Sequence, residues 1–151
     1  MLHLCQGRAT EPEGEGPRII AHMGDDEGRW LDPSVARRWP AARRAWRRWF
    51  DQPAFDLGET QVVPVGPGLW VASMVVGRGE DRLECPGPQP IRYPALRKCL
   101  RAVKEEAVRR GATLHLDRPA EWPPMKALLL EEVAPEVEVY VYEAPPGAPP
   151  A

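Results

Sequence analysis

The spacing of hydrophobic and polar positions divides the chain into short segments of two kinds. Short apolar runs rich in β-branched residues predict strands, and apolar residues at helical spacing predict helices. The predicted strands cover residues 1–5, 17–23, 57–65, 69–76, 112–116 and 136–144, and the predicted helices cover residues 34–50, 93–111 and 123–134. Helices that alternate with short strands favour a mixed α/β sheet covered by helices on both faces.

Two of the predicted helices carry proline or glycine at informative places. Pro40 lies inside segment 34–50, so we expect two abutting helices, or one helix kinked at Pro40. Pro94 opens segment 93–111, and Gly111 is a natural C-terminal cap for it. In the first segment, the apolar residues that recur at helical spacing are Val35, Trp39, Ala42, Trp46, Trp49 and Phe50.

The length and composition are those of one globular domain. The chain has 151 residues, of which 43% are hydrophobic and 28% are charged, enough for a hydrophobic core. We expect a single domain at residues 1–143 and a disordered, proline-rich tail at residues 144–151. No apolar run approaches the ~18 residues that a membrane span needs, and no signal peptide is recognised. We therefore expect a cytoplasmic protein without a membrane partner.

Three further features of the composition narrow the chemistry. The three cysteines are odd in number and lack Cys-x-x-Cys spacing, so neither a disulfide framework nor a zinc site is indicated. Abundant proline, many charges and the absence of asparagine are typical of thermophile proteins, although a genomic base bias gives the same pattern. The formal net charge of -2 gives no overall footprint for nucleic acid.

The stretch HMGDDEGRWLDP at residues 22–33 places three consecutive acidic residues directly after a predicted strand. Asp25, Asp26 and Glu27 could bind a metal ion or act as general bases, but their spacing does not match an EF-hand. The alternative is a polar loop that ends in a helix cap, with Asp32 as the N-cap residue before Pro33.

Two histidines lie in predicted buried strands. If those strands are neighbours, His22 and His115 could bind zinc together with Asp25 or Asp117. Histidines in such positions are more often core residues with satisfied hydrogen bonds. We therefore expect no metal site and no cofactor.

Arginine and tryptophan are interleaved in segment 34–50. Such a pattern can mark a nucleic-acid site. The tryptophans follow the apolar stripe, however, so we expect them to be buried and the arginines to form a solvated helix surface rather than a nucleic-acid interface.

An ordered set of stretches resembles the macro-domain family, whose members are ADP-ribose-binding modules. The resemblance spans residues 2–142 and implies a three-layer α/β/α fold with a mixed sheet of about six strands. It also implies a partner of the ADP-ribose or related nucleotide class. The stretches are GRAT (7–10), PRIIAH (17–22), ARRWPAARRAWRRW (36–49), LGETQVVPVGPGLWVASMVVGRG (57–79), PIRYPALRKCLRAVKEEAVRRGATLHL (90–116) and VYVY (139–142).

The first group of departures from the family lies at its ligand positions. Arg8 stands where the family has an aspartate that recognises adenine. Asp25 and Asp26 lie nearest to the family's asparagine for the distal ribose. The family's glycine-rich stretch, through which backbone N–H groups approach the diphosphate, is occupied here by Arg29, Leu31, Asp32 and Pro33.

The second departure is a short loop, DRPAEW at residues 117–122, where the family has a longer glycine-rich phosphate cradle. With the gap placed differently, Asp117 and Arg118 resemble the Asp-Arg pair before Trp in ADP-ribosyl glycohydrolase relatives, whose aspartate is catalytic. Arg78 lies nearest to a lysine that those relatives use, and arginine cannot act as a lysine nucleophile. Acidic residues in the first loop would repel a diphosphate, and Arg29 and Arg118 could compensate by binding phosphate.

The main interpretation is a macro-domain-like protein with a degenerate or re-specified ADP-ribose site, acting as a binding or interaction module. One alternative is an ADP-ribosyl hydrolase or deacylase, in which Asp117 or Asp25 orients water and Arg78 or Arg118 binds phosphate. The other is a basic helix that contacts nucleic acid or a protein partner. The candidate ligand-binding residues are Arg8, Asp25, Asp26, Arg29, Arg78 and Arg118.

Structural features separate these readings. An open cleft with Asp117 and Asp25 facing each other would favour the hydrolase. Exposure of Trp39, Trp46 and Trp49 would favour the nucleic-acid module. A closed cleft would argue against both ligand-based functions.

Overall fold

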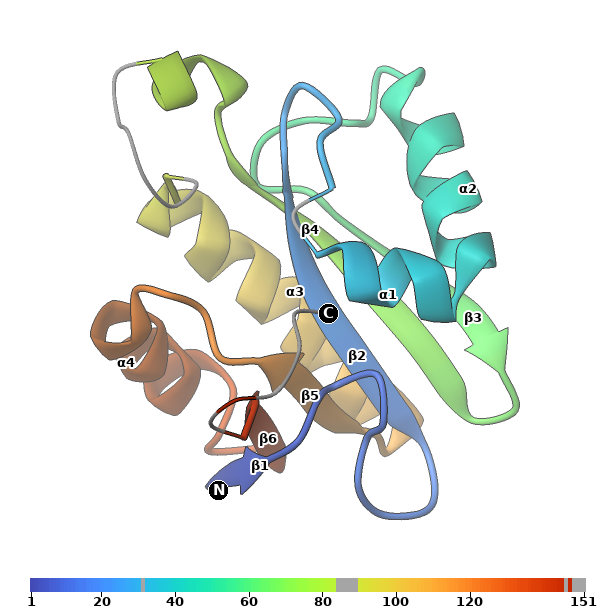
Figure 1. The fold of residues 1–151 in the computed structure, drawn as a ribbon, viewed down its shortest axis with the longest axis vertical. Coiled ribbons are helices and arrows are strands. Elements are labelled where there is room, and N and C mark those ends of the chain that lie inside the picture. Colours follow the sequence, from blue (N-terminus) through green and yellow to red (C-terminus); the bar gives the residue numbers. More distant parts are fainter. Residues whose placement is uncertain (31, 84–89, 146, 148–151) are drawn as a thin grey trace.

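The fold is built on a mixed β-sheet with the strand order β1-β6-β5-β2-β4-β3 (Figure 1). The computed structural model describes residues 1–30, 32–83, 90–145 and 147. In this spatial order, β1, β6, β5, β2 and β4 are all parallel to their neighbours. At the other edge of the sheet, β3 pairs antiparallel with β4. The strands are β1 (Leu2–Gln6), β2 (Arg18–Asp25), β3 (Thr60–Gly66), β4 (Leu69–Gly77), β5 (Thr113–Asp117) and β6 (Val139–Glu143).

Helices cover both faces of this sheet, which confirms the expected three-layer α/β/α arrangement. In Figure 1, α1 and α2 lie on one side of the sheet, and α3 and α4 lie on the other. Each layer has its own core: Ile20 and Val71 pack with Val35 of α1, whereas Ile19 and Met74 pack with residues of α3 and α4. The helices are α1 (Pro33–Arg38), α2 (Pro40–Phe50), α3 (Tyr93–Arg110) and α4 (Trp122–Glu132), and a short 3-10 helix, η1, covers Gly79–Leu83.

The predicted strands and helices are present in the predicted order. Two abutting helices are present, which is one of the two expected alternatives. Trp39 caps the end of α1, and Pro40 is the first residue of α2. Gly111 caps α3 in the left-handed conformation, with φ of 62°. Phe50 departs from its stripe: it is 43% exposed, since it is the last residue of α2 and lies beyond the buried face.

Trp46 anchors α2 to the rest of the protein. It is 1% exposed, it meets the rings of Trp30, Trp49 and Phe55 edge to face, and its Nε1 donates to the Gly28 carbonyl at 2.9 Å. Three tryptophans of α1–α2 that we expected to be buried, Trp39, Trp46 and Trp49, are therefore buried.

Gly24 allows this anchor to approach the sheet. A Cβ atom at position 24 would lie 2.4 Å from Cη2 of Trp46 and 2.7 Å from the carbonyl oxygen of Arg29. Such distances are well inside van der Waals contact, so the close packing of α2 against β2 depends on the missing side chain.

Two further expectations from the sequence concern the C-terminal tail and membrane-spanning helices. The predicted tail at residues 144–151 lies largely outside the described residues. Within the described ranges, no helix combines the length and apolar character needed to cross a lipid bilayer.

Candidate functional site

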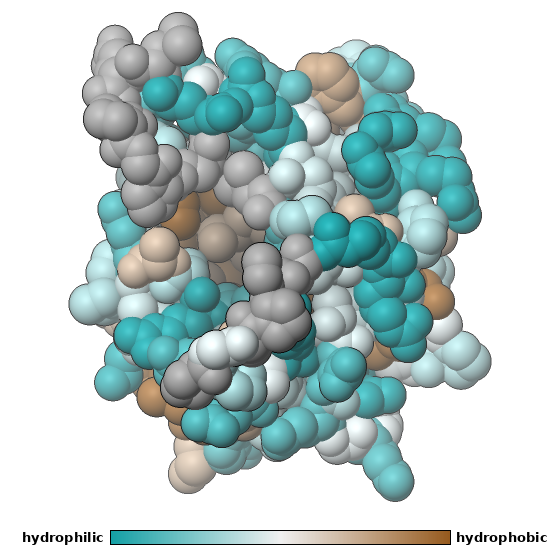
Figure 2. All heavy atoms as spheres, in the orientation of Figure 1, coloured by the Kyte–Doolittle hydropathy of each residue, from teal (hydrophilic) through white to brown (hydrophobic). Residues whose placement is uncertain are grey.

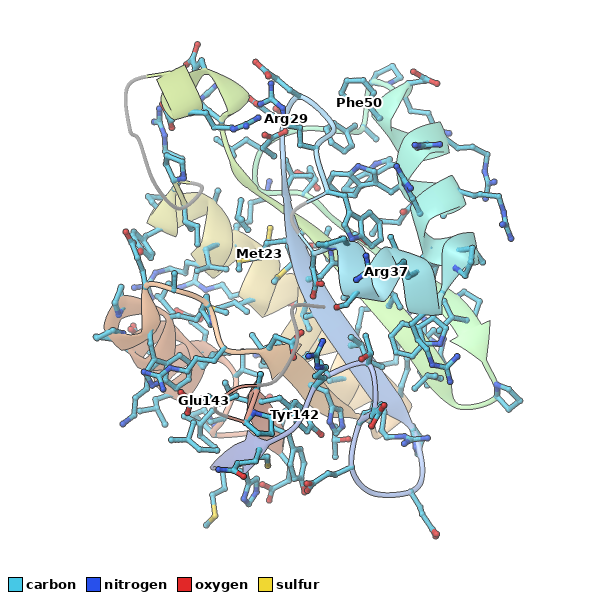
Figure 3. All side chains as sticks on the ribbon, viewed as in Figure 1. Met23, Arg29, Arg37, Phe50, Tyr142 and Glu143 are labelled. Atoms are coloured by element: carbon cyan, nitrogen blue, oxygen red, sulfur yellow. The ribbon has the colours of Figure 1, made fainter. Side chains whose placement is uncertain are left out.

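A cavity of about 280 Å³ opens beside the carboxyl ends of β2 and β5. Its floor is apolar, formed by Ala21, Met23, Met74 and Leu116. Figure 2 shows a hollow with an apolar floor at this place, and Figure 3 shows Met23 lying beside β2 toward it. Ligands of open α/β sheets bind outside the carboxyl ends of the strands, so this cavity is the candidate site. Polar groups are contributed by His22, Asp32, Asp117 and Arg118.

Asp117 is the last residue of β5, and its carboxylate faces the loop that follows β1. Its Oδ1 accepts a hydrogen bond of 2.8 Å from the backbone N–H of Ala9. Burial raises the pKa of the Asp117 carboxyl, and the adjacent Asp32 raises it further by charge and by a hydrogen bond, whereas Ala9 and Arg8 lower it. Asp117 is therefore a carboxyl group whose negative charge is disfavoured at the cavity.

Asp32 has two roles in this arrangement. Its Oδ1 accepts a hydrogen bond of 3.0 Å from the backbone N–H of Ser34, which confirms the predicted N-cap of α1. The same side chain lines the cavity next to Asp117. Only the capping role could be predicted for Asp32, because an aspartate before Pro-Ser is fully explained by a helix start.

Two arginines lie around Asp117. Arg118 lines the cavity, its Nη1 donates to Glu143 Oε1 at 3.0 Å, and its guanidinium lies 5.7 Å from the ring centroid of Trp122. Arg8 is half-buried in the loop after β1, and its charge favours the ionised form of Asp117. The structure thus brings three predicted site residues together: Arg8, Asp117 and Arg118.

Asp25 is instead the centre of its own loop. The residue is fully buried, and its Oδ1 accepts from the backbone N–H groups of Glu27 and Arg29, both at 3.0 Å. Its Oδ2 accepts from Nη1 of Arg29 at 3.2 Å, and Arg29 also pairs with Glu27 at 2.8 Å. These bonds close the turn after β2, where Arg29 is labelled in Figure 3.

Asp26 connects the same turn to the segment after β4. Its Oδ1 accepts from the backbone N–H of Gly79 at 2.8 Å, and its Oδ2 lies 3.6 Å from Nη1 of Arg78. Asp25, Asp26, Arg29 and Arg78 do not occur among the described residues that line the cavity. The predicted site residues therefore form two groups, one at the cavity and one in this turn, and Asp25 does not face Asp117 across the opening.

The two strand histidines are buried and already hydrogen-bonded. Nε2 of His22 lies 2.6 Å from Oγ of Ser73, and its ring stacks on Trp30 with centroids 3.8 Å apart. His115 bonds Tyr142 through Nδ1 at 2.8 Å and Thr113 through Nε2 at 2.7 Å. Burial lowers the pKa of each histidine to about 4, so both are neutral at pH 7.

No metal site is formed by the residues that the structure describes. Within that part of the chain, no group of three or more His, Cys, Asp or Glu side chains is arranged to hold a metal ion. His22 lines the cavity; its Nε2 is hydrogen-bonded to Ser73 and its ring stacks on Trp30, whereas its buried Nδ1 has no hydrogen-bond partner among the described residues. The cavity therefore offers carboxyl oxygens and one guanidinium to a ligand.

Comparison with solved structures gives this site its context. No protein-family model matches the chain, and no curated protein matches it. A protein from Bacteroides thetaiotaomicron is 31% identical, over 94% of this chain and 99% of that chain, with a TM-score of 0.85. A macrodomain protein from Streptomyces coelicolor is 32% identical, over 95% of this chain and 99% of that chain, with a TM-score of 0.80.

A more distant match extends the same fold. The macrodomain of Thermus aquaticus DarG is 16% identical, over 95% of this chain and 98% of that chain, with a TM-score of 0.73. The fold thus defines a class of protein: a three-layer α/β/α domain with a cavity at the carboxyl ends of its parallel strands. The chain belongs to the macrodomain family, as its likeness to the Streptomyces coelicolor protein shows along almost its whole length.

Proposed function

We propose that this macrodomain binds a nucleotide of the ADP-ribose class in the cavity beside β2 and β5, through a re-specified set of contacts. One observation carries the proposal: Asp32, Asp117 and Arg118 converge on a cavity with an apolar floor. Binding sites for small molecules combine such an apolar lining with a few polar groups. We assign the protein to the binding modules rather than to the efficient enzymes.

The chemistry of the lining suggests how the ligand lies. Carboxylates accept hydrogen bonds from hydroxyl groups, so Asp32 and Asp117 suit the hydroxyls of a ribose. Arg118 suits a phosphate, because a guanidinium group binds phosphate oxygens in pairs. Arg8 does not line the cavity, but its positive charge acts on Asp117. The volume of about 280 Å³ is at the lower end for ligand sites, so the cavity holds one part of the nucleotide and leaves the rest outside.

Calorimetric titration with ADP-ribose tests this proposal. We expect a dissociation constant of about 1–100 μM, which corresponds to about -8 to -5.5 kcal/mol. Ribose 5-phosphate should compete, since the ribose and one phosphate make the proposed contacts. Absence of heat at millimolar ADP-ribose would mean that the domain keeps the family's fold without its ligand.

Two variants sharpen this titration. Asp117→Asn should weaken ADP-ribose binding about tenfold, because hydrogen bonds to a charged acceptor are the stronger ones. Asp51→Asn makes the same chemical change at an exposed residue after α2, and we expect it to bind as the parent does. Equal loss in both variants would contradict the assignment of Asp117.

A second candidate function, hydrolysis of an ADP-ribosyl bond, is favoured by the paired carboxyl groups. Burial and the neighbouring Asp32 raise the pKa of Asp117, and a raised carboxyl pKa suits proton transfer near neutral pH. In this scheme, ionised Asp117 takes a proton from water while the water oxygen attacks the ribosyl or ester carbon. The bond to the leaving group breaks, and Asp117 returns the proton that it took from water to the leaving group.

Turnover of an ADP-ribosylated peptide separates hydrolysis from binding alone. A hydrolase should lose at least about 100-fold in kcat in Asp117→Asn, and its parent rate should rise with pH through the ionisation of Asp117. A parent protein that binds ADP-ribose but releases none from the peptide would rule out the second candidate and leave the first standing.

A further inference from the structure

Six arginines crowd the outer surface of α1 and α2. No acidic residue occurs between Pro33 and Phe50, and all six guanidinium-bearing side chains are exposed. Hydrophilic side chains cover this part of the molecule in Figure 2, and Figure 3 labels Arg37 on α1. The six are Arg37, Arg38, Arg43, Arg44, Arg47 and Arg48.

These arginines also lack carboxylate partners within the described residues. The ion pairs of the described chain involve Arg and Lys residues elsewhere, including every cation of α3, and none of the six on α1–α2. Arg38 makes one ring contact, with its guanidinium 5.3 Å from the Trp39 centroid. The net charge of the whole chain is -2, so a concentrated positive surface exists on a slightly acidic protein.

Two adjoining hollows run across this surface. The first, of about 460 Å³, is lined by Trp30, Pro33, Ala36, Arg37, Pro40, Arg43, Arg44 and Arg47. The second, of about 530 Å³, continues past Arg38 and Trp39 to the turn between β3 and β4. Pro40 and Arg44 line both hollows, which therefore adjoin along α2. We call the two hollows together the arginine track. Of the six arginines, Arg48 lies off this track.

The shape and chemistry of the arginine track indicate a polymer with repeated phosphates. Each of its two hollows has the volume of a small-ligand site, and because they lie next to each other, the pair is longer than one such site. Every cation along it is an arginine, which binds phosphate oxygens in a planar, two-point geometry that lysine cannot make. The half-buried Trp30 adds an aromatic wall, and a basic groove beside an aromatic ring is the arrangement that binds single-stranded nucleic acid.

We propose that the arginine track binds the phosphodiester backbone of single-stranded nucleic acid. This revises the sequence expectation of a merely solvated surface, since sequence alone shows neither the missing counter-ions nor the hollows. The buried tryptophans of α2 take no part, and Trp30 supplies the aromatic contact. The proposal does not depend on nucleotide binding in the cavity, which uses Asp32, Asp117 and Arg118.

Fluorescence anisotropy with labelled oligothymidylate and oligouridylate of about 12 nucleotides tests the arginine track. We expect binding at about 50 mM salt that weakens linearly in a log-log plot. Neutralisation of three to five phosphates gives a slope of about -2 to -3.5. DNA and RNA strands should bind comparably, because the backbone is the shared element. Absence of binding to both strands at low salt would overturn the proposal.

Matched variants locate the contact. Arg44→Ala removes the arginine shared by both hollows and should weaken binding about tenfold, with a slope shallower by about 0.7. Arg48→Ala, on the same helix but off the track, and Arg101→Ala, an ion-paired arginine on α3, change the net charge equally and should lose less than about threefold. Equal losses in all three variants would reduce the effect to diffuse charge and overturn the track.

Competition identifies the kind of polyanion. Unlabelled oligothymidylate should displace the probe more effectively than polyglutamate of equal charge, because carboxylates on a peptide lack the regular phosphate spacing. Duplex DNA should compete less well than the single strand, whose bases can reach Trp30. Displacement by polyglutamate at equal or lower concentration would overturn the nucleic-acid assignment in favour of an acidic protein.

Discussion

The outer surfaces of α1–α2 and of α3 carry six cationic side chains each, and they use them differently. On α3, each of the six lies in an ion pair, with partners on its own helix, on α4 and on nearby segments. On α1–α2, the described residues provide no such partner. The six cations of α3 are Arg97, Lys98, Arg101, Lys104, Arg109 and Arg110.

The difference lies in the neighbours rather than in the helices. Glu106 is within α3 and pairs with Arg109 and Arg110, while Glu132 of α4 receives Arg97 and Arg101. Segment 33–50 has no acidic residue of its own. Exposed ion pairs add little to stability, but they neutralise a surface. A surface without ion pairs stays positively charged and can attract a polyanion, but its like charges repel one another.

The largest expected effect comes from removing the support beneath the unpaired surface. Trp46→Ala deletes a buried ring and its hydrogen bond to Gly28, and it should cost about 3–5 kcal/mol in free energy of unfolding. Urea titration measures this loss. Phe50→Ala, at an exposed residue of the same helix, is the control and should cost far less. Similar losses in both would mean that the core beneath α2 is not organised around Trp46.

As the pH falls, we expect the buried histidines to lower the stability of the fold before the ion pairs of α3 are affected. His22 and His115 have folded pKa values of about 4 against about 6.5 when unfolded. Between these values the unfolded chain binds more protons, so stability falls as the pH drops from 6.5 to 4. The loss reaches about 3 kcal/mol for each histidine.

Urea titrations between pH 7 and pH 4.5 check this expectation. The arginine partners lower the pKa of Glu106 and Glu132 below the ordinary value of 4.5, although burial opposes this at Glu106. The pairs that Glu106 and Glu132 make therefore keep most of their charge over this range. His22→Gln should remove about half of the pH dependence. A flat profile in the parent protein would contradict the depressed histidine pKa values.

The smallest expected effect is the change in stability when one arginine is replaced by glutamate, and its sign should differ between the two surfaces. Arg44→Glu places a carboxylate three and four residues before Arg47 and Arg48, and should raise stability by about 0.5 kcal/mol at low salt. Arg101→Glu on α3 breaks the pair with Glu132 of α4 and should lower stability. Urea midpoints at low and at high salt measure both, and the two differences should shrink in high salt. A shift of the same sign in both variants would remove the contrast between the surfaces.

Much of the fold could be predicted from the sequence because its signals are local. Pro40 interrupts the helical stripe, Gly111 supplies a left-handed cap, and β-branched runs mark the strands. The burial of Trp46 followed from its spacing. The exposure of Phe50 was not predicted. The last apolar residue of a helix can lie beyond the core, and periodicity alone does not reveal this.

The site was less predictable because its contacts join distant segments. Asp117 and Arg118 were recognised through the family resemblance, but the donor from Ala9 lies 108 positions away in the chain. Asp25 drew attention as an acidic residue after a strand, and the hydrogen bonds that occupy it depend on the shape of the turn. The unpaired state of the arginines was invisible for the same reason, since it depends on which segments lie beside α1 and α2 in the folded chain.

The close approach between Gly24 and Trp46 also has a consequence for the history of the sequence. Any side chain at position 24 would overlap the indole ring and the carbonyl of Arg29. The two positions are therefore expected to vary together among relatives of this chain, with a side chain at 24 only where 46 carries something smaller than tryptophan and the backbone at 29 has shifted. Paired replacement at these positions would be the mark of a lineage in which α2 stands further from the sheet.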